Sequence, residues 1–162
     1  MATVSTYNGF RDTLASLTLS QQRQVGSRFI ANVLDLAHDP RLRQVVDVAA
    51  RADATAEELQ LAYRTAHTVY VETHPRSDLA ELDFDRQAAH FVAEACMTCL
   101  GPMYPEATTH HLGQKVALYC RMARTCSSIA HKADKADFSS VEVAADAIVE
   151  DQYAILNKFT KK

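Results

Sequence analysis

The sequence predicts an all-α protein, and three observations indicate this fold class. Glycine and proline are scarce, with four of each in 162 residues, and they stand where helices would stop. Alanine is abundant, and most segments repeat apolar residues with the period of an α-helix. No strand pattern competes. We expect one helical domain over 1–162, with a short N-terminal arm or helix over 1–17 and a helical core over 18–160.

The first two long helices are predicted from capping and proline signals. Thr18 and Gln21 have the spacing of a capping box, followed by an apolar face, so we expect a helix over 20–38. Pro40 suits the first turn of the next helix, which we place over 40–52.

The middle helices are bounded by similar signals. Thr55 and Glu58 form a second capping-box pattern, and the third helix that they start is broken by "THPRS" at 73–77. A fourth helix is expected over 79–100, where "LGPMYP" supplies a glycine and proline stop.

Two further helices complete the predicted fold. The fifth spans about 107–131, and the charged segment "HKADKADF" connects it to the sixth. The sixth begins at Ser139, which has capping-box spacing to Glu142. Short connections between helices of similar length favour antiparallel neighbours. The expected architecture is an antiparallel helical bundle or short αα-stack of about six to seven helices.

Composition narrows the functional class. The net charge of −3 gives no electrostatic reason to expect nucleic acid as a partner. No apolar run approaches the ~20 residues that cross a bilayer. The N-terminus lacks the basic start and apolar stretch of a signal peptide. We therefore expect a cytoplasmic protein without a membrane partner, whose four cysteines are reduced thiols.

The pair Cys96 and Cys99 is the most chemically suggestive pattern in the chain. At 100° per residue both point away from the polar stripe of the fourth helix, whose last half is apolar around most of its circumference. The polar stripe consists of Asp83, Gln87, His90 and Glu94. That pattern is typical of a central, buried helix, in which free cysteine packs as a small apolar residue. The pair also lies at a helix C-terminus, whereas redox pairs use the N-terminal dipole to lower the thiol pKa. We favour core cysteines, and predict no cofactor.

A site for a small ligand or a metal, formed by His and Cys side chains between the helices, is the alternative that the sequence leaves open. Zinc requires four donors, usually as two close pairs. Cys96 and Cys99 would be one pair, and His110 with His111 on the fifth helix would be the other. A di-iron site is disfavoured because Asp35 and His38 form the single acid-x-x-His pair in the sequence. An enzyme whose site is assembled across helices also stays open.

An acidic ridge on the last helix is the best candidate for partner binding. Glu142, Asp146 and Glu150 repeat every four residues, and Tyr153 and Asn157 continue the same face. Like charges at this spacing each cost a few tenths of a kcal/mol. Such a ridge with a tyrosine would dock a basic protein. A solvated face is the alternative. Tyr63, His67 and Tyr70 on the third helix would allow a homodimer if their edge faced another chain.

Two segments resemble a small all-helical immunity-protein-like family from bacterial polymorphic-toxin systems. The first runs over 39–67, and "VEVAADAIVEDQYAILNKF" is similar to the family's closing helix. The matching features in the first segment are Asp39, Arg41, Ala49, Ala50, Glu57, Glu58, Ala66 and His67. The chain departs from the family over 90–120, where members carry a dense alanine- and histidine-rich block. The resemblance implies a non-enzymatic inhibitor that binds and blocks a protein partner.

Overall fold

The computed structural model describes residues 3–75, 83–101 and 111–161. Within these ranges the chain forms seven α-helices and one 3-10 turn, without a strand, which confirms the all-α prediction. The elements are α1 (Tyr7–Ser16), α2 (Leu19–Ala31), η1 (Leu34–Leu36), α3 (Pro40–Ala50), α4 (Ala56–Glu72), α5 (Phe84–Leu100), α6 (Leu112–Ala130) and α7 (Ser139–Thr160).

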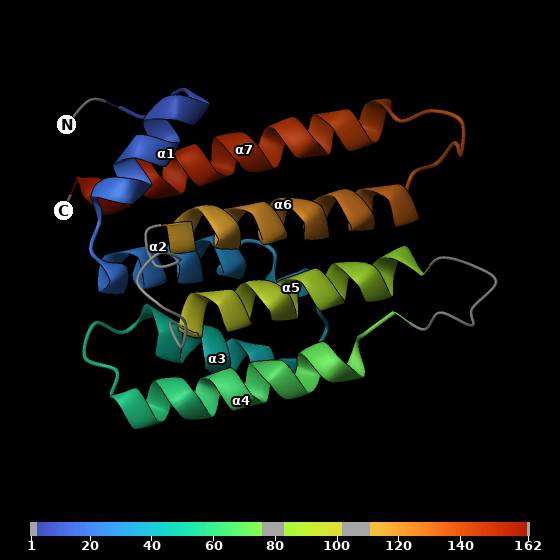
Figure 1. The fold of residues 1–162 in the computed structure, drawn as a ribbon. Coiled ribbons are helices and arrows are strands. Elements are labelled where there is room, and N and C mark those ends of the chain that lie inside the picture. Colours follow the sequence, from blue (N-terminus) through green and yellow to red (C-terminus); the bar gives the residue numbers. More distant parts are fainter. Residues whose placement is uncertain (1–2, 76–82, 102–110, 162) are drawn as a thin grey trace.

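The helices form two layers (Figure 1). Helices α4, α5, α6 and α7 lie side by side in chain order, and successive helices run in opposite directions. Helices α2 and α3 lie behind this layer, and α1 crosses the C-terminal end of α7. Helix α5 packs against α2, α3, α4, α6 and η1. It is therefore the central helix, as its nearly continuous apolar circumference predicts.

Local capping starts the helices where the sequence predicts. Both capping boxes are complete: Thr18 with Gln21 begins α2, and Thr55 with Glu58 begins α4. Asp39 caps α3 and Pro40 occupies its first turn. In each case a side-chain oxygen accepts a hydrogen bond from a backbone N–H group that the first helical turn leaves free.

The helix predicted over 20–38 is wrong in its second half. Helix α2 ends at Ala31, and the chain continues through the 3-10 turn η1. The Asn32 carbonyl accepts a hydrogen bond from Arg124 of α6, and its side chain donates to Asp151 of α7. These long-range contacts fix Asn32 as a helix end. His38 then adopts a left-handed backbone (φ 52°) that turns the chain into α3.

The predicted starts of the last three helices have different outcomes. Helix α5 begins at Phe84, because Asp83 has an extended backbone and accepts a hydrogen bond from the Arg86 N–H group, and the earlier start predicted at 79 falls outside the described residues. Helix α6 begins at Leu112, and the earlier start predicted at about 107 falls outside the described residues. Helix α7 does begin at Ser139, but Phe138 precedes it without a side-chain cap, so the predicted box with Glu142 does not form.

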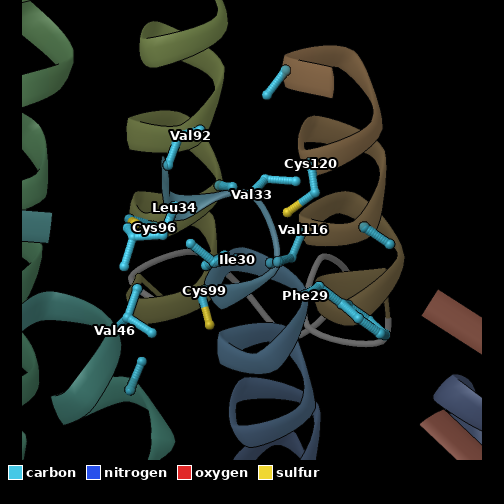
Figure 2. Close-up of a cluster of buried hydrophobic side chains, with 14 of the residues drawn as sticks. Phe29, Ile30, Val33, Leu34, Val46, Val92, Cys96, Cys99, Val116 and Cys120 are labelled. Carbon is cyan, nitrogen blue, oxygen red and sulfur yellow. The ribbon is translucent and has the colours of Figure 1, made fainter. Parts of the chain in front are cut away.

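The core lies between the two layers (Figure 2). Phe29 and Ile30 of α2, Val92 of α5 and Val116 of α6 are buried there. Helix α5 packs against helices of both layers. Its small side chains let these neighbouring helices approach closely. Among the described helices, none is long and apolar enough to cross a membrane.

Candidate functional site

The acidic ridge lies on the first half of α7, with Glu142, Asp146 and Glu150 exposed to solvent. In the described part of the chain, no basic side chain forms an ion pair with any of the three. Val143, between the first two carboxylates, is 69% exposed. The ridge is therefore accessible, and no ion pair with a described residue offsets its like-charge repulsion.

Tyr153 does not belong to this ridge, so that part of the prediction is wrong. Its side chain is buried, and its ring centroid lies 5.4 Å from that of Phe10 in α1. Asn157, one turn further on, exchanges two hydrogen bonds with the backbone of Val4, at 2.7 and 2.9 Å. The N-terminal segment thus covers the second half of the face, and the ridge ends at Glu150.

The cysteines are packing residues, as predicted. Cys96, Cys99 and Cys120 are fully buried between α5, α6 and α2, and all four thiols are free (Figure 2). The Cys99 thiol donates to the Arg23 carbonyl at 3.2 Å. Burial raises the pKa of Cys99 to about 12 and raises the pKa values of the other three as well. A neutral thiol is a poor nucleophile at physiological pH.

Of the two histidines in the alternative metal site, one lies within the described residues. His110 lies outside the described residues, and His111 is exposed immediately before α6. Within the described ranges, no cluster of three or more His, Cys, Asp or Glu side chains has the arrangement of a metal site. The pairing of Cys96 and Cys99 with His110 and His111 therefore stays a hypothesis for that segment.

A hollow of about 190 Å³ opens beside the C-terminal end of α5. The described residues that line it include no histidine or tyrosine, and they are Leu19, Ser20, Arg23, Leu59, Cys99, Leu100 and Leu112. Arg23 donates to the carbonyls of Ala49 and Arg51 and so satisfies the C-terminal end of α3. The hollow is mainly apolar, and its described lining brings no nucleophile and base together.

A row of aromatic and imidazole rings runs across α4, α5 and α6. On α4, the exposed His67 ring lies between Tyr63 and Tyr70, 6.4 Å from each ring centroid. Tyr70 stacks at 4.2 Å on His90 of α5. Phe91 of α5 stacks on Tyr119 of α6 at 6.4 Å. We call this set the aromatic face, and its residues are Tyr63, His67, Tyr70, His90, Phe91 and Tyr119.

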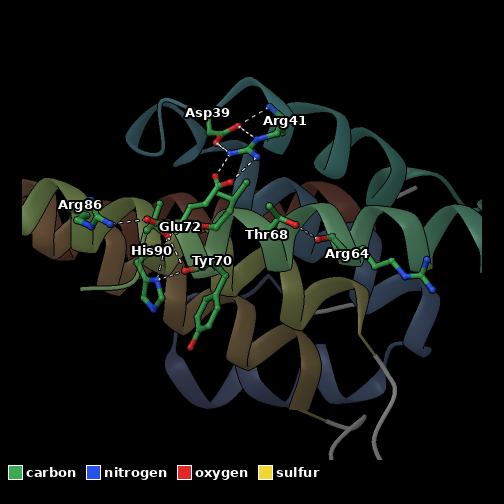
Figure 3. Close-up of polar contacts among 10 residues, drawn as sticks. Asp39, Arg41, Arg64, Thr68, Tyr70, Glu72, Arg86 and His90 are labelled. Atoms are coloured by element: carbon green, nitrogen blue, oxygen red, sulfur yellow. Dashed lines mark hydrogen bonds and ion pairs between the residues drawn. The ribbon is translucent and has the colours of Figure 1, made fainter. Parts of the chain in front are cut away.

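His90 anchors the aromatic face between α4 and α5 (Figure 3). Its side chain is 7% exposed, and Nδ1 donates to the Tyr70 carbonyl at 3.1 Å. Thr73 Oγ1 lies 3.3 Å from the same nitrogen. Burial lowers the pKa of His90, with nearby His74 acting in the same direction and Glu94 opposing it. The imidazole is therefore neutral at physiological pH.

This histidine makes stability depend on pH. A folded pKa below the unfolded value means that the unfolded chain binds more protons, so stability falls as pH drops through the range below about 6.5. We expect the melting temperature to fall more for the wild type than for His90→Gln between about pH 7.5 and 5.5. Thermal unfolding followed by circular dichroism measures this. Equal falls in the two proteins would show that His90 is not the group responsible.

Comparisons with known proteins give no relative: no family model, no curated protein and no solved structure matches the chain. Its function is therefore inferred from the geometry of the chain itself. This geometry brings together His90, Tyr70 and Tyr119, which sequence patterns assigned to separate helices. Two sequence patterns pointed to residues of this surface. One is the Tyr63–His67–Tyr70 edge on one helix, and the other is the polar stripe with His90 and Glu94 on the next.

Proposed function

We propose that this chain is a non-enzymatic protein-binding helical protein that acts through an open surface. The observation that carries the proposal is the aromatic face, in which five rings are accessible or half-buried across α4, α5 and α6. Tyrosine and phenylalanine are enriched at the energetic centres of protein interfaces, because rigid rings bury much area at a small cost in entropy.

The distribution of polar groups supports a surface rather than an enclosed site. In the described part of the chain the hollow is lined mainly by apolar groups, and the buried thiols are held neutral. The acidic ridge supplies three accessible carboxylates, which favour a partner with a basic surface and accelerate its association. A cytoplasmic location fits four free cysteines.

A toxin as the partner is the more specific form of this proposal. It rests on the resemblance of residues 39–67 and 141–159 to immunity-like proteins of bacterial toxin systems. A neutralising protein would bind its target tightly and without turnover. Co-expression with the product of an adjacent toxin-like gene tests this form, and growth rescue that depends on the aromatic face would support it.

The general proposal is tested by recovering a partner from the cells that make this protein. The variant His67→Asp places a charge at the centre of the aromatic face, and the expected result is at least a tenfold loss of the recovered partner. Leu61→Asp is the matched control, because Leu61 is 66% exposed on the same helix and lies outside the aromatic face. The Glu150→Lys variant tests the ridge independently.

The outcomes are distinct. Loss of binding in His67→Asp with retention in Leu61→Asp supports the aromatic face. Unchanged binding in Glu150→Lys removes the ridge from the interface. If no protein is retained specifically by the wild type, or if all variants retain it equally, the proposal is wrong.

A further inference from the structure

Two histidines, one of α5 and one just after α4, meet at one end of the aromatic face. His74 follows the C-terminal end of α4, and His90 lies in the first half of α5. Their ring centroids are 5.2 Å apart, and the ring planes are nearly perpendicular, at 76°. His74 is exposed, so the pair is open to solvent on its side. No role in the partner-binding surface requires this pairing.

The end of α4 is held in place by α5. The Arg86 guanidinium donates to the Glu72 carbonyl at 2.7 Å and to the His74 carbonyl at 3.4 Å (Figure 3). These bonds satisfy carbonyls that the last helical turn leaves free. They also fix the backbone of His74 relative to the helix that carries His90, so the two imidazoles are positioned before any ligand arrives.

Both imidazoles have the same tautomer. His74 Nδ1 lies 3.0 Å from the Pro75 carbonyl oxygen, and His90 Nδ1 lies 3.1 Å from the Tyr70 carbonyl oxygen. A carbonyl only accepts, so each Nδ1 donates its proton to a carbonyl, and Nε2 is the ring nitrogen that is left to bind a metal ion. A hydrogen bond from one ring nitrogen to a backbone carbonyl is the arrangement that orients metal-binding histidines.

We propose that His74 and His90 form a two-imidazole site for a divalent transition-metal ion, zinc or copper. Imidazole nitrogens suit both ions. Two Nε2 atoms at ~2.1 Å from one ion place their ring centroids roughly 5 Å apart at a tetrahedral angle, which matches the separation found here. Water completes the coordination, since the described residues offer no cluster of three or more protein donors.

The local charges are compatible with a bound cation. Glu94 lies one helical turn beyond His90, and its negative charge acts on that imidazole. Arg86 opposes it, although its guanidinium is engaged by the carbonyls of α4.

The test uses the full, tag-free chain titrated with zinc chloride at neutral pH by calorimetry, and with copper(II) followed by electron paramagnetic resonance. We expect one ion per chain and nitrogen hyperfine coupling from two imidazoles. His74→Ala should weaken binding at least tenfold, and the exposed position of His74 means that the fold is retained. His90→Gln should have the same effect on binding.

Two controls separate this pair from the other histidines. His67→Ala changes an exposed imidazole two turns earlier on α4 and should leave the affinity unchanged. A His110→Ala/His111→Ala variant should also bind normally. The proposal is overturned if the wild type shows no saturable binding at millimolar metal. Equal affinities of the wild type and His74→Ala, or loss of binding in the His110→Ala/His111→Ala variant alone, would overturn it too. Partner recovery by the metal-free protein tests the proposed function separately.

Discussion

Replacing Phe10 with alanine is expected to lower the free energy of unfolding by about 3–5 kcal/mol, as for other aromatic residues removed from protein cores. Phe10 is 1% exposed although α1 is a short helix at the edge of the molecule. Its ring centroid lies 5.8 Å from that of Phe29 and 5.4 Å from that of Tyr153. Alanine would leave a cavity between α1, α2 and α7, and urea unfolding measures the loss.

The matched control is Tyr7→Ala on the same helix. Tyr7 is 55% exposed, so this variant should change the free energy of unfolding by less than about 0.5 kcal/mol. Both substitutions remove an aromatic ring from α1 and differ only in burial. Equal and small losses in the two variants would mean that α1 is not docked on α7 in solution.

The same contact explains why Tyr153 was wrongly assigned to the acidic ridge. At 100° per residue, Tyr153 lies about 20° from Glu142 around the axis of α7, so helical periodicity alone places both on one face. What divides that face is α1, which covers Tyr153 and leaves Glu142 exposed. A pattern within one helix cannot indicate that a distant segment covers part of it.

Two of the three capping boxes predicted from local signals form, and the box of Ser139 with Glu142 does not. The boxes at Thr18 and Thr55 depend on groups within four residues, and both form as expected. Asn32 ends α2 through contacts with α6 and α7, which no local pattern contains. The all-α class and the central position of α5 were accessible because they depend on periodicity over many residues.

The candidate site could be predicted only in parts. Sequence patterns gave the tyrosine and histidine edge of α4 and the stripe of α5 with His90 and Glu94. Joining them requires the register between the two helices, which Arg86 fixes through the Glu72 carbonyl. The acceptor of that bond is a backbone oxygen of the neighbouring helix. The bond therefore cannot be predicted from the identity of the residue that carries the acceptor.

The thiols of Cys96, Cys99 and Cys120 are expected to react with a disulfide reagent at least on the order of 10³-fold more slowly in the folded chain than in the unfolded chain. With its pKa raised to about 12, Cys99 is ~10⁻⁴ thiolate at about pH 8, whereas an unperturbed thiol is roughly one quarter ionised. Burial also denies the reagent access, so reaction must await opening of the core. Absorbance of the released thiolate measures the rate.

Cys126 is the least buried of the four, at 8% exposure, so the experiment is best made in a Cys126→Ser background. The same chain in denaturant provides the control and should release three equivalents rapidly. Rapid modification of two or more thiols in the folded protein would contradict the prediction. It would mean that α5 opens to solvent along its Cys96–Cys99 side, and a redox or metal role for that pair would then outweigh packing. Slow reaction of all three thiols would instead mean that they become reactive only when the whole core opens, because α5 contacts helices of both layers.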